Sequence, residues 1–173
     1  MRKTIYIIES LSQWTGKAFS MVCLSLVLLL TFEVFMRYVL DAPTQFSYEV
    51  ASSMGVAIGA GGLAYTHLHG GHVRVDVFWK SLSPKGRAIA DIIGSLIFLF
   101  PLFIFLVWIS AQWAIESFIN KEVMTTTFWY PIAWPVRTVM LLGLLLLLPQ
   151  GVGEILRNIC IIKGIELKKV EEL

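Results

Sequence analysis

Long uncharged apolar runs alternate with short polar segments along the 173-residue chain. The hydrocarbon core of a bilayer is about 30 Å thick, so a helix needs about 20 mostly apolar residues to cross it. Four stretches meet this requirement and predict membrane spans at about residues 16–38, 47–67, 88–118 and 135–156. The expected fold is an all-α integral membrane protein, with residues 1–173 forming a single four-helix domain.

The segment before the first span has its own apolar pattern. Ile5, Ile8, Leu11 and Trp14 recur at helical spacing within residues 2–14, which favours a short interfacial helix. No small-residue cleavage motif follows the first apolar run, so we expect this run to remain as a membrane anchor.

Composition supports the membrane assignment. The chain is 57% hydrophobic and 15% charged, whereas soluble domains average about 45–50% apolar and about 25% charged residues. These values exclude a soluble enzyme, a disordered chain and a disulfide scaffold. Cys23 and Cys160 form no Cys-x-x-Cys pair, and we interpret them as two unpaired small hydrophobic residues.

The distribution of positive charge predicts the orientation. Eleven of the 14 Lys and Arg residues lie in the N-terminal segment up to Lys17, between the second and third spans, or in the C-terminal tail. By the positive-inside rule, both termini should be cytoplasmic. The connections at residues 39–46 and 119–134 would then lie on the outer side.

The second span is rich in small residues. Gly55 and Gly59 form a Gly-x-x-x-Gly pattern, which permits close helix packing, and Gly62 extends it. The alternative is a helix that lines a conduit. Pro101 should kink the third span and free a backbone carbonyl, and Pro135 suits the first turn of the fourth.

Charged residues near the outer ends of the spans need an explanation, because charges in membrane helices are costly. Glu33 and Arg37 lie four residues apart on one helix face and should pair. Glu49 opens the second span and could meet Arg37 across the short loop, while Arg137 lies at the same level on the fourth span. Structural pairing or partner docking is one interpretation, and transport chemistry is the other.

Three histidines, His67, His69 and His72, follow the second span. Such spacing can bind a metal, and membrane haem proteins also use histidine ligands. All three lie at one boundary, however, so a polar helix end is the preferred interpretation. No nucleophile elbow, P-loop, dinucleotide fingerprint or zincin motif occurs, and we expect no enzyme activity.

Two motifs in order carry a family resemblance. Residues 35–40 read FMRYVL, and after a short loop with Pro43, residues 46–49 read FSYE. Residues 71–76 read GHVRVD. Together they resemble the small membrane (Q-type, DctQ-like) subunit of tripartite ATP-independent periplasmic (TRAP) transporters, which typically has R-Y-x-x, then W-S-E-E, and later H-[IV]-x-[IV]-D. Phe46 and Tyr48 depart from that pattern.

The resemblance implies an accessory role. In TRAP systems a periplasmic binding protein captures the solute, commonly a carboxylate, and a large membrane subunit moves it by a sodium-driven elevator motion. The small subunit would pack against the large one as a static scaffold and help dock the binding protein. We therefore expect a multi-pass protein of a bacterial or archaeal inner membrane, with lipid contacts and no nucleic-acid partner. It should need no cofactor, bind no metal and hold no substrate site.

The resemblance also assigns expected roles to residues. Docking of the binding protein, or pairing within the outer hairpins, is expected of Arg37, Asp41, Gln45, Ser47, Glu49, Lys121, Glu122 and Trp129. Subunit packing is expected of Gly55, Gly59 and Gly62, and the cytoplasmic connector should be fixed by His72, Arg74 and Asp76.

Three alternatives remain open from the sequence. The chain could be the haem-binding or structural membrane anchor of another complex, a small drug exporter that uses Glu33, or a structural four-helix protein with another partner. Haem would give a Soret band, and an exporter would need a deeper acid and shorter loops.

Overall fold

The computed structural model describes residues 2–70 and 82–164. All regular elements in these ranges are helical, in agreement with the predicted all-α class. They are α1 (Arg2–Tyr38), α2 (Ser47–Leu68), α4 (Pro84–Gly94), the π-helical turn η1 (Ser95–Leu99), α5 (Phe100–Ile119) and α6 (Trp134–Ile162). The expected connector residues His72, Arg74 and Asp76 lie outside the described residues.

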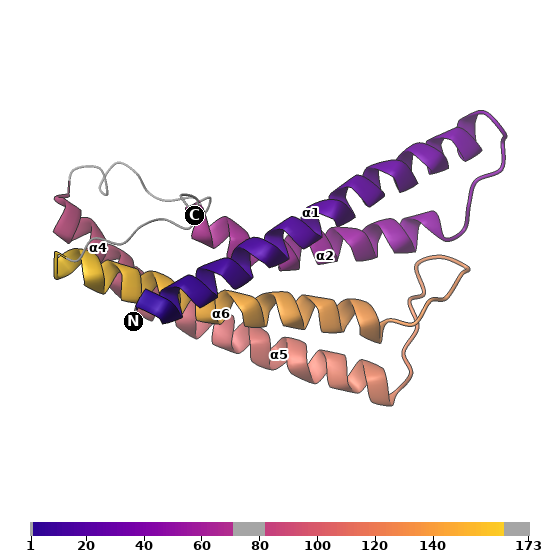
Figure 1. Cartoon of the computed structure of the whole chain (residues 1–173). Helices are drawn as coiled ribbons and strands as arrows, with labels where there is room; N and C mark the ends of the chain where they lie inside the picture. The colour runs from indigo at the N-terminus through magenta and orange to yellow at the C-terminus, as the bar shows by residue number, and fades with distance from the viewer. Residues whose placement is uncertain (1, 71–81, 165–173) are drawn as a thin grey trace.

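The helices form two antiparallel hairpins, α1–α2 and α5–α6, which meet through α2 and α6 (Figure 1). Helix α6 is central, because it also contacts α1 and α4. Residues 39–46 connect α1 to α2 and residues 120–133 connect α5 to α6, and both connections lie at one end of the molecule, at the right of Figure 1. We call this end the hairpin end and the opposite end, where α1 begins and α6 finishes, the terminal end.

Three helical segments are long and apolar enough to cross a membrane: Lys3–Tyr38, Pro84–Ile119 and Trp134–Ile162. The second predicted span is present as the 22-residue helix α2, within one residue of its expected bounds. Its glycines and polar residues keep it outside this apolar set, because they contribute little hydropathy. Three of the predicted spans are therefore helices long and apolar enough to cross a membrane, and the crossing of the membrane by α2 remains a proposal.

Helix α1 begins at Arg2, 14 residues before the predicted span, and runs to Tyr38 without a break. The segment expected to be a separate interfacial helix is thus its first four turns. The helical spacing is confirmed, and the four apolar residues are not equivalent: Ile5 is buried, whereas Leu11 and Trp14 are exposed. Polar residues share the buried face with Ile5, so this segment presents apolar side chains outwards, as a lipid-facing helix does.

The third predicted span begins four residues early, at Pro84. Ser83 caps this helix by accepting a hydrogen bond from the Gly86 amide (3.2 Å), and Pro84 occupies the first turn, where its missing amide costs nothing. Just before Pro101, where a kink is expected, the helix contains the π turn η1. There the Phe100 amide bonds to the Ser95 carbonyl, five residues back.

Close packing of α2 on α6 forms the centre of the molecule. A Cβ atom built on Gly143 of α6 would lie 2.4 Å from the Ala60 carbonyl carbon, so only glycine fits there. Ala64 and Leu147 are fully buried nearby in sequence on the same two helices. Helix α6 extends six residues beyond its predicted end and continues through Pro149.

Candidate interaction surface at the hairpin end

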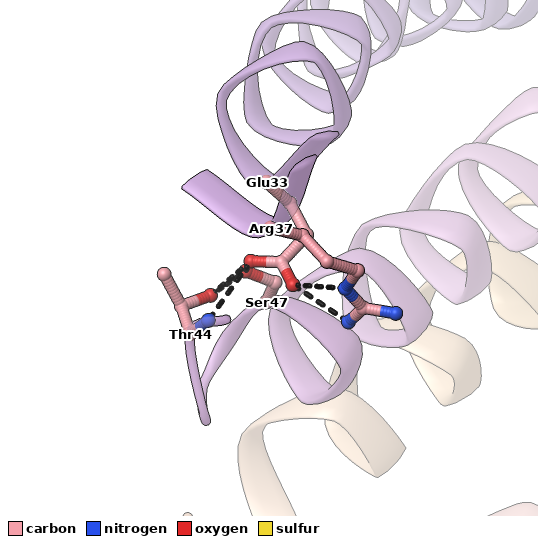
Figure 2. Close-up of polar contacts among 4 residues, drawn as sticks. All are labelled: Glu33, Arg37, Thr44 and Ser47. Carbon is pink, nitrogen blue, oxygen red and sulfur yellow. Dashed lines mark hydrogen bonds and ion pairs between the residues drawn. The ribbon is translucent and has the colours of Figure 1, made fainter. Parts of the chain in front are cut away.

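A carboxylate network closes the connection between α1 and α2. Glu33 Oε1 accepts hydrogen bonds from Arg37 Nη2 (2.7 Å) and Nε (3.2 Å), which confirms the predicted pair. Glu33 Oε2 accepts from the Ser47 hydroxyl (2.6 Å), the Thr44 amide (3.3 Å) and the Thr44 hydroxyl. Figure 2 shows these donors converging on the one carboxylate from the end of α1, the loop and the start of α2. Glu33 thereby fixes where the chain turns back.

Glu49 has a different partner from the one the sequence suggested. It is 2% exposed, and its Oε1 accepts hydrogen bonds from the amide (3.0 Å) and hydroxyl (3.3 Å) of Thr127. The hydrogen bonds of Arg37 within the described ranges all go to Glu33, so the suggested Glu49–Arg37 pair is wrong. Glu49 instead joins the first hairpin to the connection of the second.

An aromatic contact strengthens the same junction. The rings of Phe46 and Trp129 meet edge to face, with centroids 6.1 Å apart. Phe46 departs from the tryptophan of the TRAP pattern, yet it keeps an aromatic contact. The two hairpins are therefore joined at this end by one charged hydrogen-bonded link and one ring pair.

The second hairpin is held by an ion pair of its own, which was not predicted from the sequence. Glu122 receives two hydrogen bonds of 2.6 Å from Nη1 and Nη2 of Arg137, and the guanidinium lies 4.5 Å from the Trp113 ring centroid. A bidentate pair of this kind combines strength with fixed geometry. Arg137 and Glu122 were both noted as charged residues, but their sequence separation gave no sign that they pair.

The remaining predicted surface residues lie in the two connections. Asp41 and Lys121 are exposed and have positive φ values of 51° and 48°, each just after a helix end. Gln45 is also exposed. By contrast, Ser47 is buried and serves the Glu33 network. Of the predicted set, Ser47 and Glu49 are buried and hold the connections in place, as do the exposed Arg37, Glu122 and Trp129, while Asp41, Gln45 and Lys121 are simply exposed.

A pocket of about 410 Å³ lies between the two connections. The first hairpin contributes one charged, two polar and one aromatic side chain, and the second connection contributes the rest. The lining residues are Arg37, Thr44, Gln45, Tyr48, Thr126, Thr127 and Phe128.

The three glycines expected to pack against another subunit leave open space in this chain. A Cβ atom built on Gly55, Gly59 or Gly62 would meet nothing within 4 Å. The close intrachain contacts of the second span are instead made by Ala60 and Gly61, on the other side of the helix.

A buried polar seam at the terminal end was missed from the sequence. Glu9 Oε1 accepts a hydrogen bond from Arg157 Nη1 (2.8 Å), and the Ser12 hydroxyl donates to Gln150 Oε1 (2.7 Å). These contacts join α1 to α6 across more than 130 residues of sequence. The available signal was the spacing of polar residues in otherwise apolar helices, since such residues tend to face a partner helix.

The histidines near the end of α2 have local partners. The His69 ring Nδ1 lies 2.9 Å from the Tyr65 carbonyl oxygen, and the Tyr65 and His69 rings have centroids 4.2 Å apart. Within residues 2–70 and 82–164, no group of three His, Cys, Asp or Glu residues is placed to hold a metal ion. His72 falls outside these ranges.

A comparison with protein families decides the assignment. The family model described as "Tripartite ATP-independent periplasmic transporters, DctQ component" matches residues 26–161. The chain belongs to this family. The match spans most of the chain and includes α2, α4 and α5 entirely, so the DctQ assignment confirms the resemblance found in the motifs.

The family assignment makes the protein a small component of a TRAP transporter, embedded in a membrane through apolar helices. A DctQ component is part of a transporter rather than a class of enzyme. No curated protein and no solved structure matches the chain.

Proposed function

We propose that this DctQ component is a static scaffold for the large permease subunit of its transporter and a docking surface for the periplasmic binding protein. The observation that carries the proposal is the open face of α2. Glycines at positions 55, 59 and 62 expose backbone on one side of a helix in a membrane-embedded chain. Small residues in membrane helices allow a neighbouring helix to approach closely.

The proposed topology places all four helical segments across the inner membrane. Helix α2 has 22 residues, which at 1.5 Å per residue gives about 33 Å, enough to cross the hydrocarbon core. Its low hydropathy suits a helix enclosed by α1 and α6 on one side and by the permease on the other. The positive-inside rule puts the terminal end in the cytoplasm and the hairpin end in the periplasm.

The contacts in the chain support the proposed division of labour. The charged residues Glu33, Glu49 and Arg137 serve internal links at the hairpin end. We assign sodium coupling and the site for a carboxylate solute to the permease subunit. The contribution of this chain is a rigid, wide membrane surface that resists the movement of its partner.

The test is purification of the tagged chain in mild detergent from its native membranes, with mass spectrometry of the proteins that accompany it. We expect a large polytopic permease in the wild-type sample and its loss in Gly59→Leu, because leucine would occupy the approach surface. Gly94→Leu is the matched control, since Gly94 also faces open space but lies on α4. Recovery of the chain alone, or of the permease with Gly59→Leu, would refute the scaffold role.

The docking role has a separate test in solute uptake. Glu49→Arg should lower uptake several-fold while the permease still co-purifies, because the loss of both hydrogen bonds to Thr127 displaces the second connection. Glu49→Gln keeps an acceptor oxygen and should retain more activity than Glu49→Arg. Normal uptake by the Glu49→Arg complex would exclude a role of this junction in docking.

A further inference from the structure

The pocket at the hairpin end combines features that suit one chemical group. Its volume of about 410 Å³ falls at the small end of the range for binding sites. Its lining includes the Arg37 guanidinium, the Thr126 hydroxyl group and the Gln45 amide, which are donors suited to an anion. The hydroxyl groups of Thr44 and Thr127 already donate to Glu33 and Glu49.

Among the residues that the structure describes, the guanidinium of Arg37 is only half used. Glu33 Oε1 receives its two hydrogen bonds from Nε and Nη2, which form one edge of the planar group. In Figure 2 the third guanidinium nitrogen projects away from Glu33. The Nη1–Nη2 edge is therefore available, and this edge matches a carboxylate in bidentate geometry. The Arg37 side chain is 54% exposed.

Glu33 and Glu49 do not compete for this edge. Both oxygens of Glu33 are occupied by donors from Arg37, Thr44 and Ser47. Glu49 is 2% exposed and directed to Thr127. An incoming anion thus meets the partly free guanidinium of Arg37 and the hydroxyl group of Thr126.

The rim of the pocket resembles a protein-binding surface. Phe128 is 82% exposed and Tyr48 is 60% exposed, and both line the pocket. Aromatic residues beside an arginine are enriched among the residues that dominate binding energy at protein interfaces. Exposed rings around a polar floor favour a macromolecular side chain over a free solute, because a partner protein would cover them.

We infer that this pocket receives an aspartate or glutamate side chain of the docked binding protein, held bidentately by Arg37. The inference rests on the proposed docking function and gives it a contact chemistry. Tyr48 and Phe128 cover the flanks of the inserted side chain, and the Thr126 hydroxyl and the Gln45 amide complete its hydrogen bonds.

The experiment uses the whole membrane complex, reconstituted in nanodiscs, and measures its dissociation constant for the purified binding protein. Thr126 is exposed and lines the pocket, so Thr126→Trp should fill it and weaken binding about ten-fold. Thr125→Trp, at the exposed neighbouring position outside the lining, should change the constant less than about two-fold. Arg37→Met should weaken binding about ten-fold. Arg37→Lys should give a dissociation constant between those of wild type and Arg37→Met, because lysine keeps the charge and loses the bidentate geometry of the guanidinium.

A double-mutant cycle identifies the acidic partner of Arg37. Replacement of surface acids of the binding protein by lysine, one at a time, should identify one variant that loses no further affinity when combined with Arg37→Met. High salt should reduce the difference between wild type and Arg37→Met, because screening weakens an exposed ion pair.

Each other outcome overturns a defined part of the proposal. Unchanged affinity with Thr126→Trp and Arg37→Met, in complexes that bind the partner, would refute the pocket and leave docking intact. Loss of the permease from Thr126→Trp would assign the pocket to the subunit interface. Arg37-dependent binding of free succinate to the complex alone would assign it to a solute. Absence of binding to the wild-type complex would refute docking itself.

Discussion

The two sides of α2 are built from the same kind of residue and meet different surroundings. On one side, Gly61 and Ala60 lie against Phe19 and Gly143. On the other side, Gly55 and Gly59 face open space. A small residue therefore marks a place where another helix can approach closely. The residue opposite decides whether that helix belongs to the same chain or to another subunit.

The largest effect on the stability of the chain is expected from Gly143→Ala. Its new Cβ atom would lie 2.4 Å from backbone atoms of Ala60, which cannot move without shifting α2. We expect a loss of about 2–3 kcal/mol in the free energy of unfolding, measured by reversible denaturation of the purified chain in detergent. Gly94→Ala, whose Cβ atom meets nothing within 4 Å, is the control. Equal stability of the two variants would show that α2 and α6 do not pack this closely.

A smaller loss is expected from Gly61→Ala. The obstacle here is the side chain of Phe19, with its Cδ2 atom 2.3 Å from the built Cβ atom. Phe19 is only partly buried, so its ring has room to move. The same measurement should give a loss of about 1 kcal/mol. A loss as large as that of Gly143→Ala would mean that Phe19 is fixed in place.

The smallest effect on the isolated chain is expected from Gly59→Leu. Nothing lies within 4 Å of the added Cβ atom, so the free energy of unfolding should change by less than about 0.5 kcal/mol. The same variant is expected to lose the permease, which separates a partner surface from an internal one. A strongly destabilised Gly59→Leu chain would remove this distinction between the two faces.

Much of the helical framework was predictable because long apolar runs and local start signals specify it. Pro135 marked the start of α6 correctly, and the Glu33–Arg37 pair followed from its four-residue spacing. The early start of the third helix was available from Ser83 and Pro84, which form a helix cap and first turn.

The contacts between distant segments were not predictable in this way. The partner of Glu49 lies 78 residues further along the chain, and a single sequence gives the helical face of a residue without its neighbour. The same limit explains why the Glu9–Arg157 link and the extended start of α1 were not predicted. Polar residues there appeared to end the membrane segment, whereas the structure satisfies them on α6.

The π turn η1 determines which face of the segment Pro84–Ile119 is directed towards α6. The segment Pro84–Ile119 is a continuous 36-residue helical rod, and buried residues recur at Ala88, Ser95, Ser110 and Ser117. Ala88 and Ser95 are seven residues apart, as are Ser110 and Ser117, so the members of each pair lie nearly in line along the helix. Over the 15 residues from Ser95 to Ser110, however, a regular α-helix would rotate about 60° past that line. A wider turn rotates the chain less per residue, so η1 absorbs this angular surplus. The segment thereby keeps one face towards α6 over its whole length.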